Sequence, residues 1–143
     1  MDFRVAAYRI SSDPELIDID VVHDYLSNHS YWAAGRSREI VAMSVAHSAL
    51  VVGAYADDGS QIGFARMVSD RATFAWLADV FVLEPHRGQG LGRAIVRSAV
   101  EHLDMVNLHR QVLATADAHG LYADFGFVPL DHADRWMIRP GPR

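Results

Sequence analysis

Three alternating glycines join a strongly apolar stretch of this 143-residue chain to a strongly amphipathic one. The apolar stretch, Thr73–Leu83, is rich in aromatic and β-branched residues and predicts a buried strand. The amphipathic stretch, Leu91–Leu103, has an apolar residue at every fourth position and predicts a helix that buries one face. The connection, Glu84–Arg93, has glycine at positions 88, 90 and 92. Backbone N–H groups without intervening side chains can converge on an anion at a helix start, so this segment predicts an anion-binding loop.

Two familiar phosphate-binding loops do not fit this segment. A dinucleotide fingerprint needs a third glycine where this chain has Arg93. A P-loop needs lysine, and all 13 basic residues of the chain are arginine. The absence of lysine also excludes Schiff-base chemistry, and the absence of cysteine excludes disulfides, thiolate metal sites and a cysteinyl acyl-enzyme.

Composition and charge narrow the possible partners. The chain has 18 acidic against 13 basic residues, a net charge of −5, so nucleic acid is not an expected partner. Half of the residues are apolar, but no run reaches the roughly 20 that span a bilayer. No signal peptide is evident, and the eight histidines form no His-x-His or His-x-x-x-His pair, so no metal site is predicted. We expect a cytoplasmic protein with a single domain over residues 1–143.

The rest of the chain predicts a mixed α/β fold. Early apolar runs around turn residues predict antiparallel hairpins, and a strand–helix–strand unit follows them. We therefore expect a mostly antiparallel central sheet with flanking helices. The further expected strands are Phe3–Ile10, Leu50–Tyr55, Gln61–Val68, Gln111–Thr115, Val128–Leu130 and Trp136–Ile138. Three further helices are expected: one capped by Asp18 or Asp20, one capped by Ser37, and a short one over Ala118–Phe125.

An Arg-x-x-Gly-x-Gly run, Arg87–Gly92, follows the strand segment Asp79–Val82, and a second motif, Leu121–Phe127, follows later. In these two motifs the chain resembles the GCN5-related N-acetyltransferases (GNAT), and it looks like a small single-domain bacterial-type member. The likeness extends in element order from Phe3 to about Ile138. Two motifs in the right order are far more specific than a glycine loop alone.

The resemblance implies acetyl-CoA as co-substrate. Its pantetheine arm would pair with the backbone of Val80 and Val82, and the loop amides would hold its pyrophosphate. The alternatives are a flexible connection for the glycines and a solvated helix face for Arg93. The cofactor-binding residues implied are Val80, Phe81, Val82, Arg87, Gly88, Gln89, Gly90, Leu91, Gly92 and Arg93.

The resemblance also implies catalytic residues. Tyr122 matches the tyrosine that protonates the departing CoA thiolate, although it could instead pack among the neighbouring phenylalanines. Asp79 is an acid in an apolar run, where it either serves the site or takes a structural hydrogen-bonding role. The position before it, glutamate in some relatives, is Ala78 here, so a water chain to Asp79 or to a backbone carbonyl is the expected route for the amine proton.

The acceptor side is expected after the first helix, at Tyr31, Trp32 and Arg36. Aromatics and an arginine suit a small amine that also carries a carboxylate, but a loop that packs its aromatics on the sheet explains them equally well.

The leading hypothesis is direct transfer of acetyl from acetyl-CoA to the primary amine of a small molecule in a ternary complex. A protein acceptor stays open. The alternative is a non-catalytic acyl-CoA-binding sensor or interaction module on the same fold. A homodimer is also expected, with Trp136–Ile138 as a candidate contact.

Overall fold

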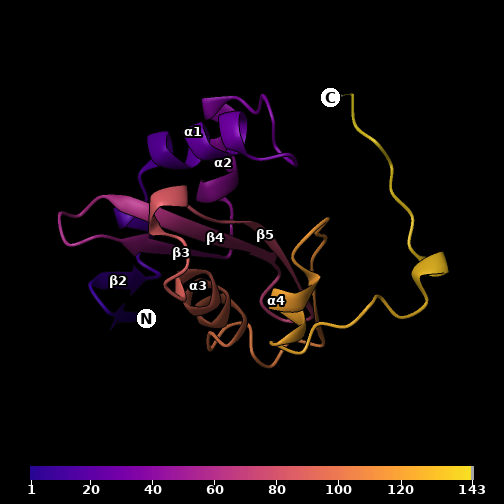
Figure 1. The fold of residues 1–143 in the computed structure, drawn as a ribbon. Helices are drawn as coiled ribbons and strands as arrows, with labels where there is room; N and C mark the ends of the chain where they lie inside the picture. Colours follow the sequence, from indigo (N-terminus) through magenta and orange to yellow (C-terminus); the bar gives the residue numbers. More distant parts are fainter. Residues whose placement is uncertain (143) are drawn as a thin grey trace.

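A six-stranded sheet with its strands in sequential order forms the centre of the computed structural model, which describes residues 1–142 (Figure 1). Neighbouring strands are antiparallel from β1 to β5, and only β5 and β6 run parallel. This mixed, mostly antiparallel architecture confirms the predicted fold class. The strands are β1 (Asp2–Val5), β2 (Tyr8–Ser11), β3 (Leu50–Tyr55), β4 (Gln61–Ser69), β5 (Phe74–Val82) and β6 (Arg110–Val112).

Helices cover both faces of the sheet. The helices α1 (Ile19–His29) and α2 (Arg38–Ala46) lie on one face, and α3 (Leu91–Val100) lies on the other, with α4 (His119–Ala123) beside it (Figure 1). Two buried clusters follow from this layering, one between α3 and the sheet and one between α1, α2 and the sheet. No helix within residues 1–142 has the length and apolar character needed to cross a membrane.

Capping side chains begin the first two helices but not the third. The carboxylate of Asp18 accepts hydrogen bonds from the backbone of α1, and the Ser37 hydroxyl accepts one from the backbone of α2. The N-cap of α3 is Gly90, which has no side chain to offer. The first N–H groups of α3 therefore remain available to donate hydrogen bonds to a ligand.

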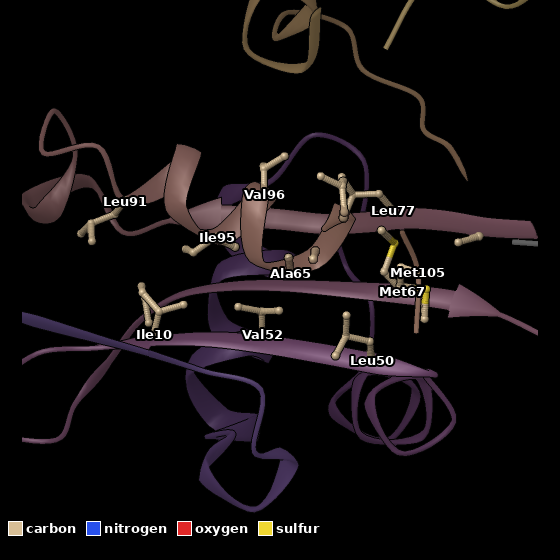
Figure 2. Packing of buried hydrophobic residues seen from close by; sticks show 14 of the residues in the cluster. Ile10, Leu50, Val52, Ala65, Met67, Leu77, Leu91, Ile95, Val96 and Met105 are labelled. Carbon is tan, nitrogen blue, oxygen red and sulfur yellow. The ribbon is translucent and has the colours of Figure 1, made fainter. Parts of the chain in front are cut away.

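The main core lies where α3 packs on the sheet (Figure 2). Leu91 and Ile95, spaced by one helical turn, are buried against strand residues such as Ile10 and Val52. This packing confirms the amphipathic helix expected from the sequence, although the helix ends at Val100 and not at Leu103. Packing of α3 fixes the position of the glycine loop relative to β5.

Three sequence expectations about strands were wrong. Phe3–Ile10 is not one strand but the β1–β2 hairpin, which turns at Ala6 with a left-handed backbone (φ 52°) that no glycine or proline announces. The segments Val128–Leu130 and Trp136–Ile138 form no strand, and the chain after α4 extends away from the sheet (Figure 1). Short apolar runs become strands only where a partner edge pairs with them, and each of these runs is only three residues long.

Candidate active site

A β-bulge in β5 places the central carboxylate of the site. Ala78 lies opposite Arg66 of β4, and Phe81 lies opposite Phe64, so β5 has one residue more than β4 between these pairs. The extra residue puts Asp79 in a left-handed backbone conformation, with φ 56°. Such a conformation costs a non-glycine residue on the order of 1 kcal/mol, so other contacts must stabilise it.

The bulge also changes the face of the sheet to which the side chains of β5 point. Before it, Leu77 packs in the cluster beneath α3. After it, Phe81 packs in the cluster beneath α1 and α2, where its ring stacks on Tyr25 with centroids 4.2 Å apart. In a regular strand, by contrast, two residues four positions apart, as Leu77 and Phe81 are, point to the same face.

Three donors hold the carboxylate of Asp79. Trp32 donates from Nε1 to Oδ1 at 2.8 Å, Arg36 donates to Oδ2 at 2.9 Å, and Arg66 donates from Nε to Oδ2 at 2.7 Å. The Asp79 side chain is 2% exposed. Burial raises its pKa, but the charges and hydrogen bonds of Arg66, and then of Arg36 and Trp32, outweigh burial and hold the pKa below its ordinary value. A carboxylate stabilised in its charged form is a weak proton acceptor.

A hollow of about 560 Å³ opens between β5 and the chain that follows β6. The two strands pair only from Phe74 to Trp76, so the rest of β5 has a free edge toward β6. The walls combine aromatic rings with the two arginines that contact Asp79. Lining residues of this acceptor hollow, as we call it, include Tyr31, Trp32, Arg36, Arg66, Phe74, Trp76, Asp79, Val80, Thr115, Asp117 and Tyr122.

A second hollow, of about 620 Å³, lies against the glycine loop, and we call it the loop hollow. Its walls are the end of β5, the loop before α3, and α4 with the turn before it. Gly88 and Gly90 have positive φ values of 82° and 80°, which favour glycine. Gly92 needs no such freedom, and a side chain there would meet only the Val82 methyl at 4.0 Å.

The polar side chains of the loop are tied to the surrounding elements. Arg87 donates to the Val82 carbonyl at 2.9 Å and to the Tyr25 hydroxyl at 3.0 Å. Arg93 forms an ion pair with Asp124 at 2.7 Å, which fixes α3 to the end of α4. These contacts hold the loop in place. Within residues 1–142, no three histidine or acidic side chains lie together as metal ligands would.

The two hollows meet at Tyr122. Val80, Asp117 and Tyr122 line both of them, as do Tyr31 and Trp32. The Tyr31 hydroxyl accepts a hydrogen bond from the Ala116 N–H at 2.8 Å, which links the loop after α1 to the turn before α4. Burial, and then the proximity of Tyr31 and Asp117, raises the pKa of Tyr122 above its ordinary value. The Tyr122 phenol therefore keeps its proton at neutral pH.

The structure brings the sequence-predicted residues together with one exception. Tyr31, Trp32 and Arg36 line the acceptor hollow with Asp79, and the expected cofactor residues line the loop hollow. Gln89 lines neither, because its amide donates to the Tyr8 hydroxyl at 3.1 Å. The sequence did not mark several residues that line the acceptor hollow, among them Arg66, Phe74, Trp76 and Asp117. The available signal was a charged residue inside an otherwise apolar strand, at Arg66.

Comparison with known proteins decides the family. A model of the acetyltransferase (GNAT) domain matches residues 47–129, more than half of the chain. The chain belongs to the GNAT acetyltransferases. This match confirms the resemblance drawn from the two motifs. The matched range extends from β3 to α4 and includes β5, which lines both hollows.

Solved and curated relatives agree with this GNAT assignment. A GNAT-family crystal structure from Xanthomonas campestris pv. campestris is 43% identical, with 94% of each chain covered and a TM-score of 0.90. A Gibberella zeae protein named as an acetyltransferase is 29% identical, over 80% of this chain and 75% of its own. A Brucella melitensis GNAT acetyltransferase, in complex with acetyl-CoA, shares the fold at 20% identity, with 85% of this chain and 83% of that chain covered and a TM-score of 0.68.

Proposed function

We propose that this GNAT protein transfers the acetyl group of acetyl-CoA directly to the primary amine of a small molecule. The observation that carries the proposal is the position of Tyr122 where the loop hollow meets the acceptor hollow. A proton donor at that point can serve a co-substrate that enters from one side and an acceptor that enters from the other.

The loop hollow suits acetyl-CoA on two grounds. The uncapped start of α3 and the glycine loop offer N–H donors to a pyrophosphate. The free edge of β5 after Trp76 offers backbone groups to the amides of a pantetheine arm. The Brucella melitensis relative, whose structure is a complex with acetyl-CoA, supports the same co-substrate.

The reaction we propose needs no acyl-enzyme. The amine nitrogen attacks the thioester carbonyl carbon, the carbon–sulfur bond breaks, and the departing sulfur takes the proton of the Tyr122 hydroxyl. The proton that the amine nitrogen loses passes to water, and the Tyr122 phenolate then takes up a proton from water, which restores the donor for the next turnover. Asp79 is a poor candidate for that proton because two guanidinium groups stabilise its charged form.

Alanine in place of Gly92 tests the loop. We expect the Gly92→Ala protein to fold with equal or higher stability, by up to about 1 kcal/mol, because alanine favours helix and its methyl group has room. We expect calorimetry to show at least about tenfold weaker acetyl-CoA binding, because Gly92 lines the loop hollow and a methyl group there takes space from the bound pyrophosphate. Gly120→Ala, in a helix and outside both hollows, is the matched control. Unchanged acetyl-CoA affinity in Gly92→Ala would reject this placement.

A homodimer is a separate proposal, and we assign its contact to a second copy of this chain. β6 is one of the two edge strands of the sheet, its Arg110 lies over the ring of Trp136, and the residues after Trp136, Met137 (96%) and Ile138 (87%), are exposed. Such apolar side chains suit a partner that supplies a strand or a face. Light scattering should give twice the chain mass for the wild type and a lower mass for Met137→Glu. A monomer mass for the wild type at all concentrations removes the proposal.

A further inference from the structure

The acceptor hollow has an uneven distribution of charge. Arg36 and Arg66 line the acceptor hollow alone, whereas Asp117 lines both hollows and so lies at their junction. One end of the acceptor hollow is therefore basic, and the end that meets the loop hollow carries a carboxylate.

The basic end keeps hydrogen-bonding capacity after its internal contacts are counted. A guanidinium group has five N–H donors. Within residues 1–142, Arg36 donates one hydrogen bond, to Asp79. Arg66 donates one to Asp79 and a long one, of 3.5 Å, to the Ser48 hydroxyl. Two guanidinium charges face one buried carboxylate there, which leaves one positive charge unmatched.

Asp79 fixes the direction of these donors. Its two oxygens accept from three side chains, so Arg36, Arg66 and the Trp32 ring are held in one arrangement. Arg36 is 24% exposed and Arg66 is 14% exposed, so a ligand reaches both without full unpacking. Pre-oriented guanidinium groups bind a carboxylate with a fork of parallel hydrogen bonds.

The walls of the same hollow are aromatic and partly exposed. Trp32 is 41% exposed and Trp76 is 45% exposed, and both line the hollow with Phe74. Large exposed aromatic rings around a concave site with a few polar groups are typical of a binding site for an apolar group.

We infer that the acceptor is a small amine that also carries a carboxylate and an apolar group, such as an amino acid. The carboxylate binds Arg36 and Arg66, the apolar group contacts the tryptophans, and the amine lies toward Asp117 and Tyr122. In this arrangement Asp79 is a positioning residue, and Arg36 and Arg66 determine specificity. This inference rests on the proposed function only for the orientation of the amine.

Equilibrium binding tests the inference without catalysis. Calorimetry on protein saturated with CoA compares L-phenylalanine with L-phenylalaninamide, and L-leucine with L-leucinamide. The members of a pair share shape and amine, and only the first carries a carboxylate. We expect the carboxylate member to bind at least about tenfold more tightly, as suits hydrogen bonds between charged groups.

Variants of Arg36 test whether this side chain causes the preference for the carboxylate. We expect Arg36→Gln to reduce the preference several-fold and Arg36→Lys to retain part of it, because lysine keeps the charge but not the fork. Arg38→Gln is the matched control, since Arg38 contacts Asp20 and lines neither hollow. Arg36 is chosen over Arg66 because it is the more exposed of the two, so its loss leaves the fold intact.

Three results overturn the inference: equal affinity within every pair, binding of neither member of any pair, or a preference that Arg36→Gln leaves unchanged. None of them depends on acetyl transfer. Failure of the proposed function shows itself differently, as carboxylate-bearing amines that bind but release no CoA thiol from acetyl-CoA.

Discussion

Asparagine in place of Asp79 should lower the free energy of unfolding by about 3 kcal/mol at pH 7, the usual scale for breaking a buried ion pair. The substitution keeps the size of the side chain but leaves Arg36 and Arg66 facing each other without a counter-charge. It also replaces one carboxylate oxygen by an NH₂ group, which cannot accept the hydrogen bonds that Oδ2 accepts from Arg36 and Arg66. For a chain of this length we expect a melting temperature about 6–12 °C lower.

The pH dependence of that loss follows from the lowered pKa of Asp79. The stabilisation is fully present above the ordinary aspartate pKa of 3.8 and disappears as pH falls from there through the lower pKa of the folded state. Urea unfolding of wild type and Asp79→Asn should thus differ by a constant amount from pH 8 to about 5, and the difference should shrink in acid. Asp57→Asn, which breaks an exposed pair with Arg4, should change little. Equal stability of Asp79→Asn and wild type at pH 7 would refute the ion-pair cluster.

Phenylalanine in place of Tyr122 should lower kcat on the order of 10²-fold while the affinity for acetyl-CoA barely changes. The substitution keeps the ring, which lies edge-on to Phe127 at 6.1 Å, and removes only the proton donor. A donor that acts on the leaving sulfur stabilises the transition state and not the bound co-substrate, so its loss falls on turnover.

Tyr55→Phe is the matched control for Tyr122→Phe. The Tyr55 hydroxyl is buried without a hydrogen-bond partner in residues 1–142, and Tyr55 lines neither hollow. Its loss should leave kcat unchanged and leave stability unchanged or higher. Steady-state thiol release on the best amine gives kcat, and calorimetry gives the affinity. Equal kcat values for Tyr122→Phe and wild type, with folding verified, would end the proton-donor assignment.

The strand–loop–helix unit could be predicted because its signals are local. Leu91 and Ile95 lie one turn apart on α3, and the glycines precede them in sequence. The contact between Arg66 and Asp79 could not be predicted from local sequence. These residues lie 13 positions apart and meet only through the register of β4 and β5, which the bulge shifts. The sequence left a structural role for Asp79 as an alternative, and its three hydrogen bonds favour that role.

In the C-terminal segment, a local signal was present but predicted the wrong structure. Trp136–Ile138 is apolar enough to suggest a strand, but a strand also needs an edge in register, and apolar character alone does not supply one. Likewise, the turn at Ala6 depends on a positive φ that alanine rarely adopts, so residue type could not announce it.

The most direct test of the central claim is product formation by the wild-type protein. Acetyl-CoA is incubated with a panel of amino acids, their amides and simple alkylamines, and CoA thiol and acetylated amine are measured together, by absorbance and by mass spectrometry. The proposed function predicts equal amounts of thiol and acetylated amine, at a rate that depends on the amine. Acetyl-CoA that binds but yields no acetylated amine from any member of the panel would contradict it and favour the non-catalytic sensor.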